Sequence, residues 1–150
     1  MRNSILLSCT IAFVGLAGCE NVDYTAMSFR ADGDRVVATG VNDEDTLSRF
    51  RIVSEDNPQA KILVLQNVGG SVEDEANLIF SQEVRAAGFT TVVPSDGMVA
   101  SGGVDLFLAG SDRVLEPGAC VGVHSWSGGG VEGKDVPRSD PEHQKILAIL

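Results

Sequence analysis

The apolar positions of this chain fall into short runs separated by polar and glycine-rich stretches. The clearest run is Lys61–Asn67 (KILVLQN), which is continuous and has the length of a strand. A continuous apolar run of this length is typical of a parallel strand covered on both faces, so it predicts the centre of a sheet. Three further strands are predicted at Arg35–Gly40, Thr90–Pro94 and Val121–His124.

Helical patterns lie between these strands. The polar cluster Asn42–Asp45 supplies capping and first-turn acidic residues for a helix. The apolar positions of this helix are Leu47, Phe50 and Val53, and Pro58 ends it. We assign no ligand role to the acidic cluster, because a helix N-terminus accounts for it.

A second helix is predicted after the central strand. Ser71 and Asp74 have the spacing of a capping box, and Gly88 has the position of a left-handed C-terminal cap. A third helix is predicted for Ser101–Ala109, which Gly110 ends. The apolar face predicted for the second helix consists of Val72, Ala76, Ile79 and Phe80.

The regular alternation of strands and helices predicts an α/β fold with a largely parallel sheet and right-handed crossovers. We assign this domain to residues 35–150 and expect residues 19–34, which are polar and aperiodic, to form a partly disordered tether. Pro141 opens a last helix that runs to Leu150 through apolar residues without a polar cap. The sequence is therefore either complete or a truncated form of a longer chain, and both possibilities stay open.

The first residues have the pattern of an export signal. The apolar run Ile5–Leu16 is about twelve residues long, which is shorter than the roughly twenty residues that cross a bilayer. The following Leu16–Cys19 (LAGC) resembles the lipobox of bacterial lipoproteins, in which the cysteine is acylated and the chain is cut just before it. The resemblance implies removal of residues 1–18, lipid such as palmitate on Cys19, and anchoring on the periplasmic side of a membrane. Glu20 favours the outer membrane, because retained lipoproteins often carry Asp there.

The charge balance excludes some partners. The chain has a formal net charge of −10 at pH 7, which becomes −11 when residues 1–18 leave with their one charged residue, Arg2. This charge argues against nucleic acid and against anionic lipid bound through basic patches, and it favours a neutral or basic partner. Removal of 18 of the 150 residues leaves 132, which is enough for one domain with one core.

Three sequence features have the residue types of a serine hydrolase. Gly69-Gly70 follows the central strand, Ser101 stands at a helix start, and His124 ends a strand. A serine hydroxyl needs a neighbouring imidazole to take its proton as it attacks a carbonyl, so Ser101 is the candidate nucleophile and His124 the candidate base. The resulting oxyanion needs backbone N–H donors, for which Gly70 and Gly102 are the candidates. Each feature alone also fits a turn, an N-cap or a structural histidine.

Taken together, these segments resemble the Clp protease proteolytic subunit family within the ClpP/crotonase fold. Asn67–Val72 is similar to the family's N-x-P-G-G-S-V signature, with Val68 in place of the proline. Val99–Gly103 (VASGG) resembles the start of the nucleophile helix, and Pro117–His124 resembles the strand that ends in the catalytic histidine. The resemblance covers residues 35–126. It implies a fold of repeated β-β-α or β-α units, with the serine and histidine above as nucleophile and base.

The chain departs from the family at the third catalytic residue. The family's aspartate lies beyond the histidine, on a stretch that this chain does not contain, and Asp135 and Asp140 are the nearest acids downstream. Lys134 leaves open a serine–lysine dyad of the kind used by other families on this fold. Three hypotheses follow: a Ser/His hydrolase of peptides or unfolded proteins, a non-catalytic binding or assembly lipoprotein, and a crotonase-like enzyme acting on thioesters.

The sequence also limits what the protein works with. It contains no G-x-x-x-x-G-K-[ST] phosphate loop, and an exported protein lacks ATP, so we expect a substrate that is already short or unfolded. We expect no cofactor and no metal site. The family resemblance implies assembly into rings, which makes a homo-oligomer a further expectation. Because acyl-CoA is a cytoplasmic metabolite, export argues against the thioester hypothesis.

Overall fold

The computed structural model describes residues 24–125, 127–128, 131–141 and 143–144. The expected export segment, the expected lipidation site Cys19 and the end of the expected last helix lie outside these ranges. Within them, no helix combines the length and the apolar character that crossing a membrane requires.

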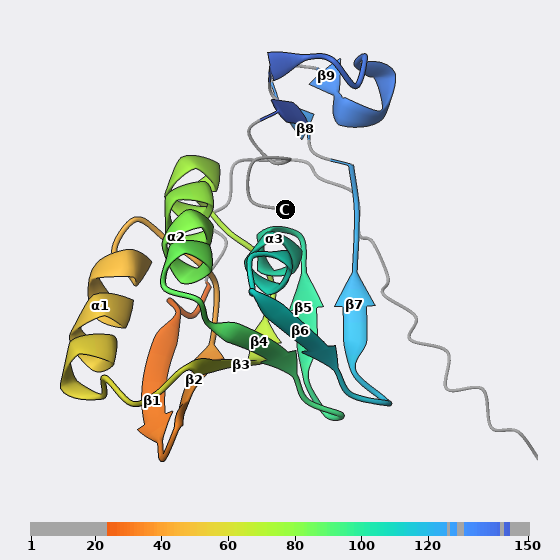
Figure 1. The fold of residues 1–150 in the computed structure, drawn as a ribbon. Helices are drawn as coiled ribbons and strands as arrows, with labels where there is room; N and C mark the ends of the chain where they lie inside the picture. Colours follow the sequence, from red (N-terminus) through yellow and green to blue (C-terminus); the bar gives the residue numbers. More distant parts are fainter. Residues whose placement is uncertain (1–23, 126, 129–130, 142, 145–150) are drawn as a thin grey trace, which may run out of the picture.

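The described residues form an α/β fold around a mostly parallel sheet, as the sequence predicts (Figure 1). In this part of the chain the main sheet has seven strands in the order β1-β2-β3-β4-β6, with β5 paired to both β3 and β7. The β1–β2 pair is antiparallel and the other pairs of this sheet are parallel. The strands are β1 Ser28–Asp32, β2 Arg35–Thr39, β3 Ile62–Val68, β4 Thr90–Val93, β5 Met98–Ala100, β6 Asp112–Leu115 and β7 Cys120–Gly122, and a separate hairpin joins β8 Ser127–Gly128 to β9 Val131–Glu132.

Strand β3 is the centre of the sheet. Its Leu63 and Leu65 side chains are fully buried, which confirms the prediction from the continuous apolar run. The first half of β3 pairs with β4, whereas Asn67 and Val68 at its end pair with the first two residues of β5. The sheet therefore forks at the end of β3, and β5 lies between β3 and β7.

Helices follow three of the strands and lie next to one another along the sheet (Figure 1). α1 packs on β1 and α2, and α2 packs on α3. Gly88 follows the C-cap of α2 with a φ of 70° and closes that helix as predicted. The helices are α1 Thr46–Asp56, α2 Asp74–Ala86 and α3 Gly102–Leu108.

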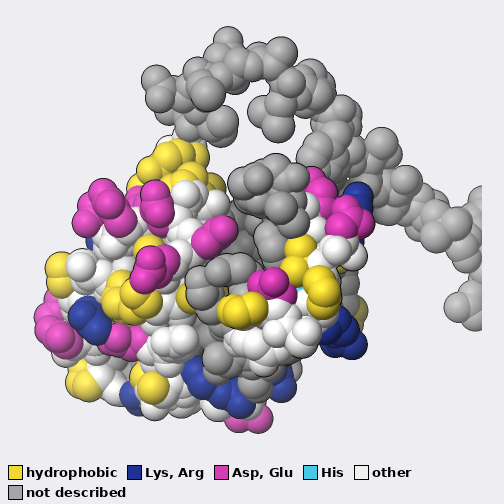
Figure 2. Space-filling view, turned by 90° about the horizontal axis from the view of Figure 1, so that it is seen from above, with side chains coloured by type: hydrophobic (Ala, Val, Ile, Leu, Met, Phe, Trp, Pro, Cys, Tyr) yellow, Lys and Arg dark blue, Asp and Glu magenta, His cyan; other side chains and the backbone are white. Residues whose placement is uncertain are grey.

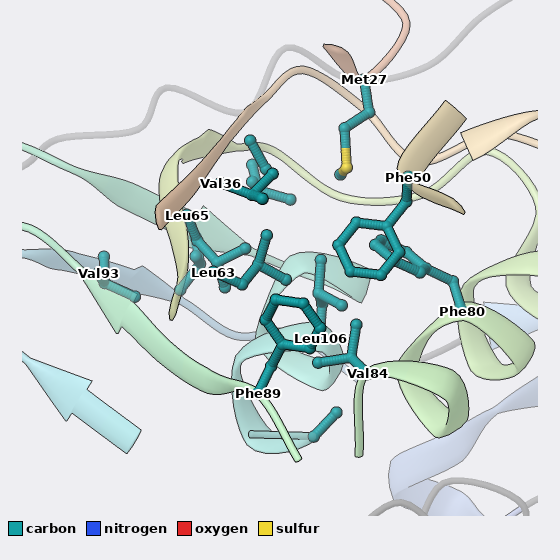
Figure 3. Packing of buried hydrophobic residues seen from close by; sticks show 14 of the residues in the cluster. Met27, Val36, Phe50, Leu63, Leu65, Phe80, Val84, Phe89, Val93 and Leu106 are labelled. Atoms are coloured by element: carbon teal, nitrogen blue, oxygen red, sulfur yellow. The ribbon is translucent and has the colours of Figure 1, made fainter. Parts of the chain in front are cut away.

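A cluster of phenylalanines ties the helices to the sheet. Figure 3 shows Phe50 of α1, Phe80 of α2 and Phe89 close together in the core. The ring centroid of Phe50 lies 5.0 Å from that of Phe80 and 5.3 Å from that of Phe89. Phe29 of β1 joins the cluster at 5.4 Å from Phe50, in an edge-on arrangement that aromatic pairs prefer. Because these rings come from distant segments, they hold β1, α1 and α2 on one core.

The face of α2 that packs on the core agrees with the predicted one at Phe80 and differs from it elsewhere. The helix begins at Asp74 after an N-cap at Glu73, so Ser71 and Val72 stand outside it. Val72 is exposed, and so is Ile79. Two of the buried positions are polar, and a prediction from apolar positions alone could not place them in the core. The buried residues of α2 are Asn77, Phe80, Ser81 and Val84.

Three strands of the main sheet were not predicted from the sequence. β1 lies within the expected tether and forms a hairpin with β2, in which Asp32 stands opposite Arg35. The two strands turn at Gly33-Asp34, where Gly33 has a φ of 64°, and a Gly-Asp pair is one of the signals for such a turn. β5 and β6 are three and four residues long. The folded part of the chain therefore includes part of the expected tether, where Met27 is already buried.

The phenylalanine cluster yields a stability prediction. Replacing Phe80→Ala removes a fully buried ring and should lower the free energy of unfolding by about 3–5 kcal/mol, because the cavity collapses only in part. Urea denaturation of the protein without residues 1–18 measures this change. Ile79→Ala, at the neighbouring position that is 48% exposed, is the matched control and should cost less than about 1 kcal/mol. Equal losses in the two variants would contradict the assignment of the α2 core face.

Candidate active site

Ser101 makes the turn from strand to helix in a conformation that non-glycine residues avoid. β5 ends at Ala100 and α3 begins at Gly102, and Ser101 between them has φ 51° and ψ −127°. Such a conformation costs on the order of 1–3 kcal/mol and needs support from its surroundings. Ser101 N donates a hydrogen bond to Gly122 O at 3.1 Å, and Ser101 O accepts one from Val104 N at 2.8 Å. A serine held in a strained strand-to-helix turn has the geometry of a nucleophile elbow.

The parallel pairing of β5 with β7 brings His124 to this serine. Ala100 stands opposite Gly122 in the pair, so the residues that follow both strands leave the same edge of the sheet. β7 ends at Gly122, and His124 therefore lies in the loop after the strand rather than on the predicted strand itself. The Nε2 atom of His124 lies 2.8 Å from Ser101 Oγ, which is hydrogen-bond distance.

The other ring nitrogen of His124 has a main-chain partner. Its Nδ1 atom lies 2.8 Å from the carbonyl oxygen of Ser125. In the described ranges neither of the acids weighed from the sequence, Asp135 or Asp140, is bonded to the ring. Lys134 meets the site through its main chain, because its backbone N–H donates to Ser125 Oγ at 2.8 Å.

Gly70 and Gly102, which are expected to form an oxyanion hole, each lie against a serine next to the other glycine. Gly70 has a φ of 144°, and a β-carbon built on it would stand 3.3 Å from Ser101 Cβ. A β-carbon on Gly102 would stand 2.5 Å from Ser71 Oγ. Within the described part of the chain, the N–H of neither glycine donates a hydrogen bond. Two main-chain donors are therefore available in the segments that touch Ser101.

A series of buried hydrogen bonds, which no sequence motif predicted, joins the glycine loop at Gly69-Gly70 to α3. The backbone of Asn42 donates to Gly70 O and accepts from Val72 N, both at 2.9 Å. The Asn42 side chain donates to Asn77 Oδ1 at 2.7 Å, and Asn77 Nδ2 donates to Asp105 Oδ2 at 3.2 Å. Asn42 and Asn77 are only 1% and 2% exposed. Asn42 therefore braces the loop rather than capping α1, whose N-cap is at residue 45.

Asp105 is the last residue of this hydrogen-bond series, and its surroundings disfavour the charged form of its carboxyl group. Burial raises the pKa of its carboxyl from the ordinary 3.8 to about 6, and the negative charge of Asp74 adds to the rise. The hydrogen bond from Asn77 favours the charged carboxylate and lowers the pKa in part. Among the described residues, no cluster of three or more His, Cys, Asp or Glu side chains has an arrangement that could hold a metal ion.

The raised pKa gives a prediction for Asp105→Asn. The folded state holds the Asp105 proton more tightly than the unfolded state does. Protonation of Asp105 therefore stabilises the folded wild-type protein fully below about pH 4, and this stabilisation is lost as pH rises through about 6. The variant keeps an oxygen for Asn77 and carries no charge. A pKa rise of this size corresponds to about 3 kcal/mol, which partial exposure of Asp105 reduces, so we expect about 1 kcal/mol of added stability at pH 8 and little at pH 4.

Thermal unfolding at the two pH values checks this prediction. Asp112→Asn, which removes an exposed carboxylate of β6, is the matched control for the change in net charge. A destabilised Asp105→Asn protein at pH 8, or a gain equal to that of the control, would contradict the electrostatic account of Asp105.

Comparisons with known proteins attach no family to this geometry. No protein-family model matches the chain, and a search of curated proteins returns no relative at a significant score. The resemblance to Clp peptidases therefore rests on the sequence motifs.

Proposed function

We propose that this chain is an exported, lipid-anchored serine hydrolase with the ClpP/crotonase fold, acting on peptides or unfolded proteins. The observation that carries the proposal is the 2.8 Å contact between Ser101 Oγ and His124 Nε2, made by a serine with a φ of +51°. The mostly parallel sheet and the order of the family-like motifs support the finer fold.

The geometry supports a two-step hydrolysis. Ser101 Oγ attacks the carbonyl carbon of the substrate while its proton passes to His124 Nε2. The negative charge that forms on the carbonyl oxygen is stabilised by N–H donors, for which Gly70 and Gly102 are the candidates. The carbon–nitrogen bond then breaks, and the proton on Nε2 goes to the leaving amine. Water hydrolyses the acyl-serine ester by the same transfers in reverse, with His124 again as the base.

The charge of the molecule points to a neutral or basic substrate. Figure 2 shows acidic side chains spread over the face seen from above in Figure 1, with basic side chains nearer its rim. A negative surface attracts cationic chains and repels anionic ones. Without an ATP-driven partner, the substrate has to arrive short or already unfolded. Because the chain resembles Clp peptidases, which assemble into rings, the proposal includes assembly into a homo-oligomer.

A binding or assembly lipoprotein that has lost catalysis is the second candidate. The observation that favours it is the partner of His124 Nδ1, which is a carbonyl rather than a carboxylate. In serine proteases the carboxylate stabilises the imidazolium that forms when the serine gives up its proton. A site without that charge is either slower or inactive, and reactivity of the serine separates the two candidates.

The proposed hydrolase function predicts that Ser101 is reactive. A fluorophosphonate probe should modify Ser101 of the mature domain, because its hydroxyl proton has a base at 2.8 Å. His124→Ala should slow the modification by about 10²- to 10⁴-fold, which is the contribution of general base catalysis, and Ser101→Ala should abolish it. Peptide mapping by mass spectrometry identifies the modified residue.

Two variants serve as controls for this labelling. Ser111→Ala removes another serine of the described domain, and His143→Gln removes the second of the two histidines. Both should be labelled at the wild-type rate. A folded wild-type protein that takes no label would contradict the hydrolase and support the binding lipoprotein.

The second prediction concerns the lipid anchor. In a bacterium that makes lipoproteins, the full chain should incorporate a palmitate analogue and fractionate with membranes. Cys19→Ser should lose both properties, because the acylated sulfur is gone, whereas Cys9→Ser, within the export segment, should keep them. Palmitate incorporated by the Cys19→Ser protein would contradict the lipobox assignment.

A further inference from the structure

A histidine base has to present an unprotonated nitrogen to the serine. In neutral imidazole one ring nitrogen carries a hydrogen and the other accepts, and the partner of the first decides which tautomer is present. The Ser125 carbonyl oxygen, 2.8 Å from His124 Nδ1, can only accept. Nδ1 therefore carries the hydrogen, and Nε2 is left to accept from the Ser101 hydroxyl, 2.8 Å away.

We propose that Ser125 is a positioning residue of this site and that its main-chain carbonyl fixes the tautomer and orientation of the His124 ring. The inference rests on the proposed hydrolase function and names how its base is oriented. Ser125 acts through His124 and touches no substrate.

The side chain of Ser125 helps to fix its own carbonyl. Ser125 Oγ accepts a hydrogen bond of 2.8 Å from the backbone N–H of Lys134. Lys134 lies in the 3₁₀ turn η1, Gly133–Asp135, where Gly133 is buried and its carbonyl accepts from Val136 N at 3.2 Å. The turn is thus ordered from within and holds the residue whose carbonyl faces the imidazole.

A carbonyl and a carboxylate differ in what they supply. Replacing the aspartate of a serine protease by asparagine costs about 10⁴ in kcat, because the amide group holds the wrong tautomer. A carbonyl cannot donate, so it preserves the correct tautomer and lacks only the negative charge. The structure therefore assigns the orienting role to Ser125.

The tautomer of His124 tests the inference without any turnover. His143→Gln leaves His124 as the one histidine of the chain, and glutamine keeps a donor for the Val136 carbonyl that His143 contacts. In ¹⁵N-labelled protein with neutral imidazole, two-bond ¹H–¹⁵N correlations should show Nδ1 protonated and Nε2 bare. Histidine in water favours hydrogen on Nε2, so this result is not the default. The Nε2–H tautomer in the folded protein would overturn the inference.

Variants of Ser125 test its part directly. Ser125→Ala, made in the same background, should allow the Nε2–H tautomer to appear and slow fluorophosphonate labelling of Ser101 by about tenfold, the factor that one neutral hydrogen bond is worth. Ser125→Thr keeps the hydroxyl and should restore both readouts. An unchanged tautomer and rate in a folded Ser125→Ala protein would overturn the role of the side chain.

The outcomes separate this inference from the function itself. Labelling of Ser101 together with an Nε2–H tautomer would keep the hydrolase and reject Ser125 as its positioning residue. An Nδ1–H tautomer in a protein that takes no label would keep the positioning geometry and reject the hydrolase.

Discussion

The parallel register of three strands is the constraint on which the candidate site depends. β5 pairs with the end of β3 on one side and with β7 on the other. In parallel strands the carboxyl ends meet at one edge, and loops at that edge are where α/β folds assemble their sites. The glycine loop after β3, Ser101 after β5 and His124 after β7 are therefore neighbours in space although they are far apart in the sequence.

Close approach of the main chain completes what the register begins. Gly70 lies against the Ser101 side chain and Gly102 against Ser71, at distances that leave no room for a β-carbon on Gly102. A β-carbon on Gly103 would fall on the Val68 carbonyl, so α3 reaches β3 only with glycine there. These contacts also supply the packing that holds Ser101 in its strained conformation.

The sequence predicted the parts of the molecule that have a local signature. The continuous apolar run of β3, the glycine cap at Gly88 and the serine at a helix start each carry one, and the structure has them where expected. Strand β1, which was not predicted, has a weaker local signature in the Gly33-Asp34 turn that follows it. The sequence did not predict parts that depend on tertiary contacts. Among them are the polar residues buried on α2 and the hydrogen bonds that run from Asn42 through Asn77 to Asp105. A main-chain carbonyl beside an imidazole has no residue type, so no motif could point to Ser125.

Among the described residues, the ring of His124 is bonded to a hydroxyl and to a main-chain carbonyl. The partly buried carboxylate of Asp105 is bonded to Asn77 instead. The proposed chemistry then relies on position and on main-chain dipoles more than on a charged partner.

The most direct test of this account is the crystal structure of the protein without residues 1–18 after reaction with a fluorophosphonate, whose phosphoryl group mimics the tetrahedral intermediate. The account predicts phosphorus bonded to Ser101 Oγ, with the phosphoryl oxygen within hydrogen-bond distance of the N–H groups of Gly70 and Gly102. An unmodified Ser101 in the folded crystal, or an adduct whose oxygen points away from both glycines, would contradict it.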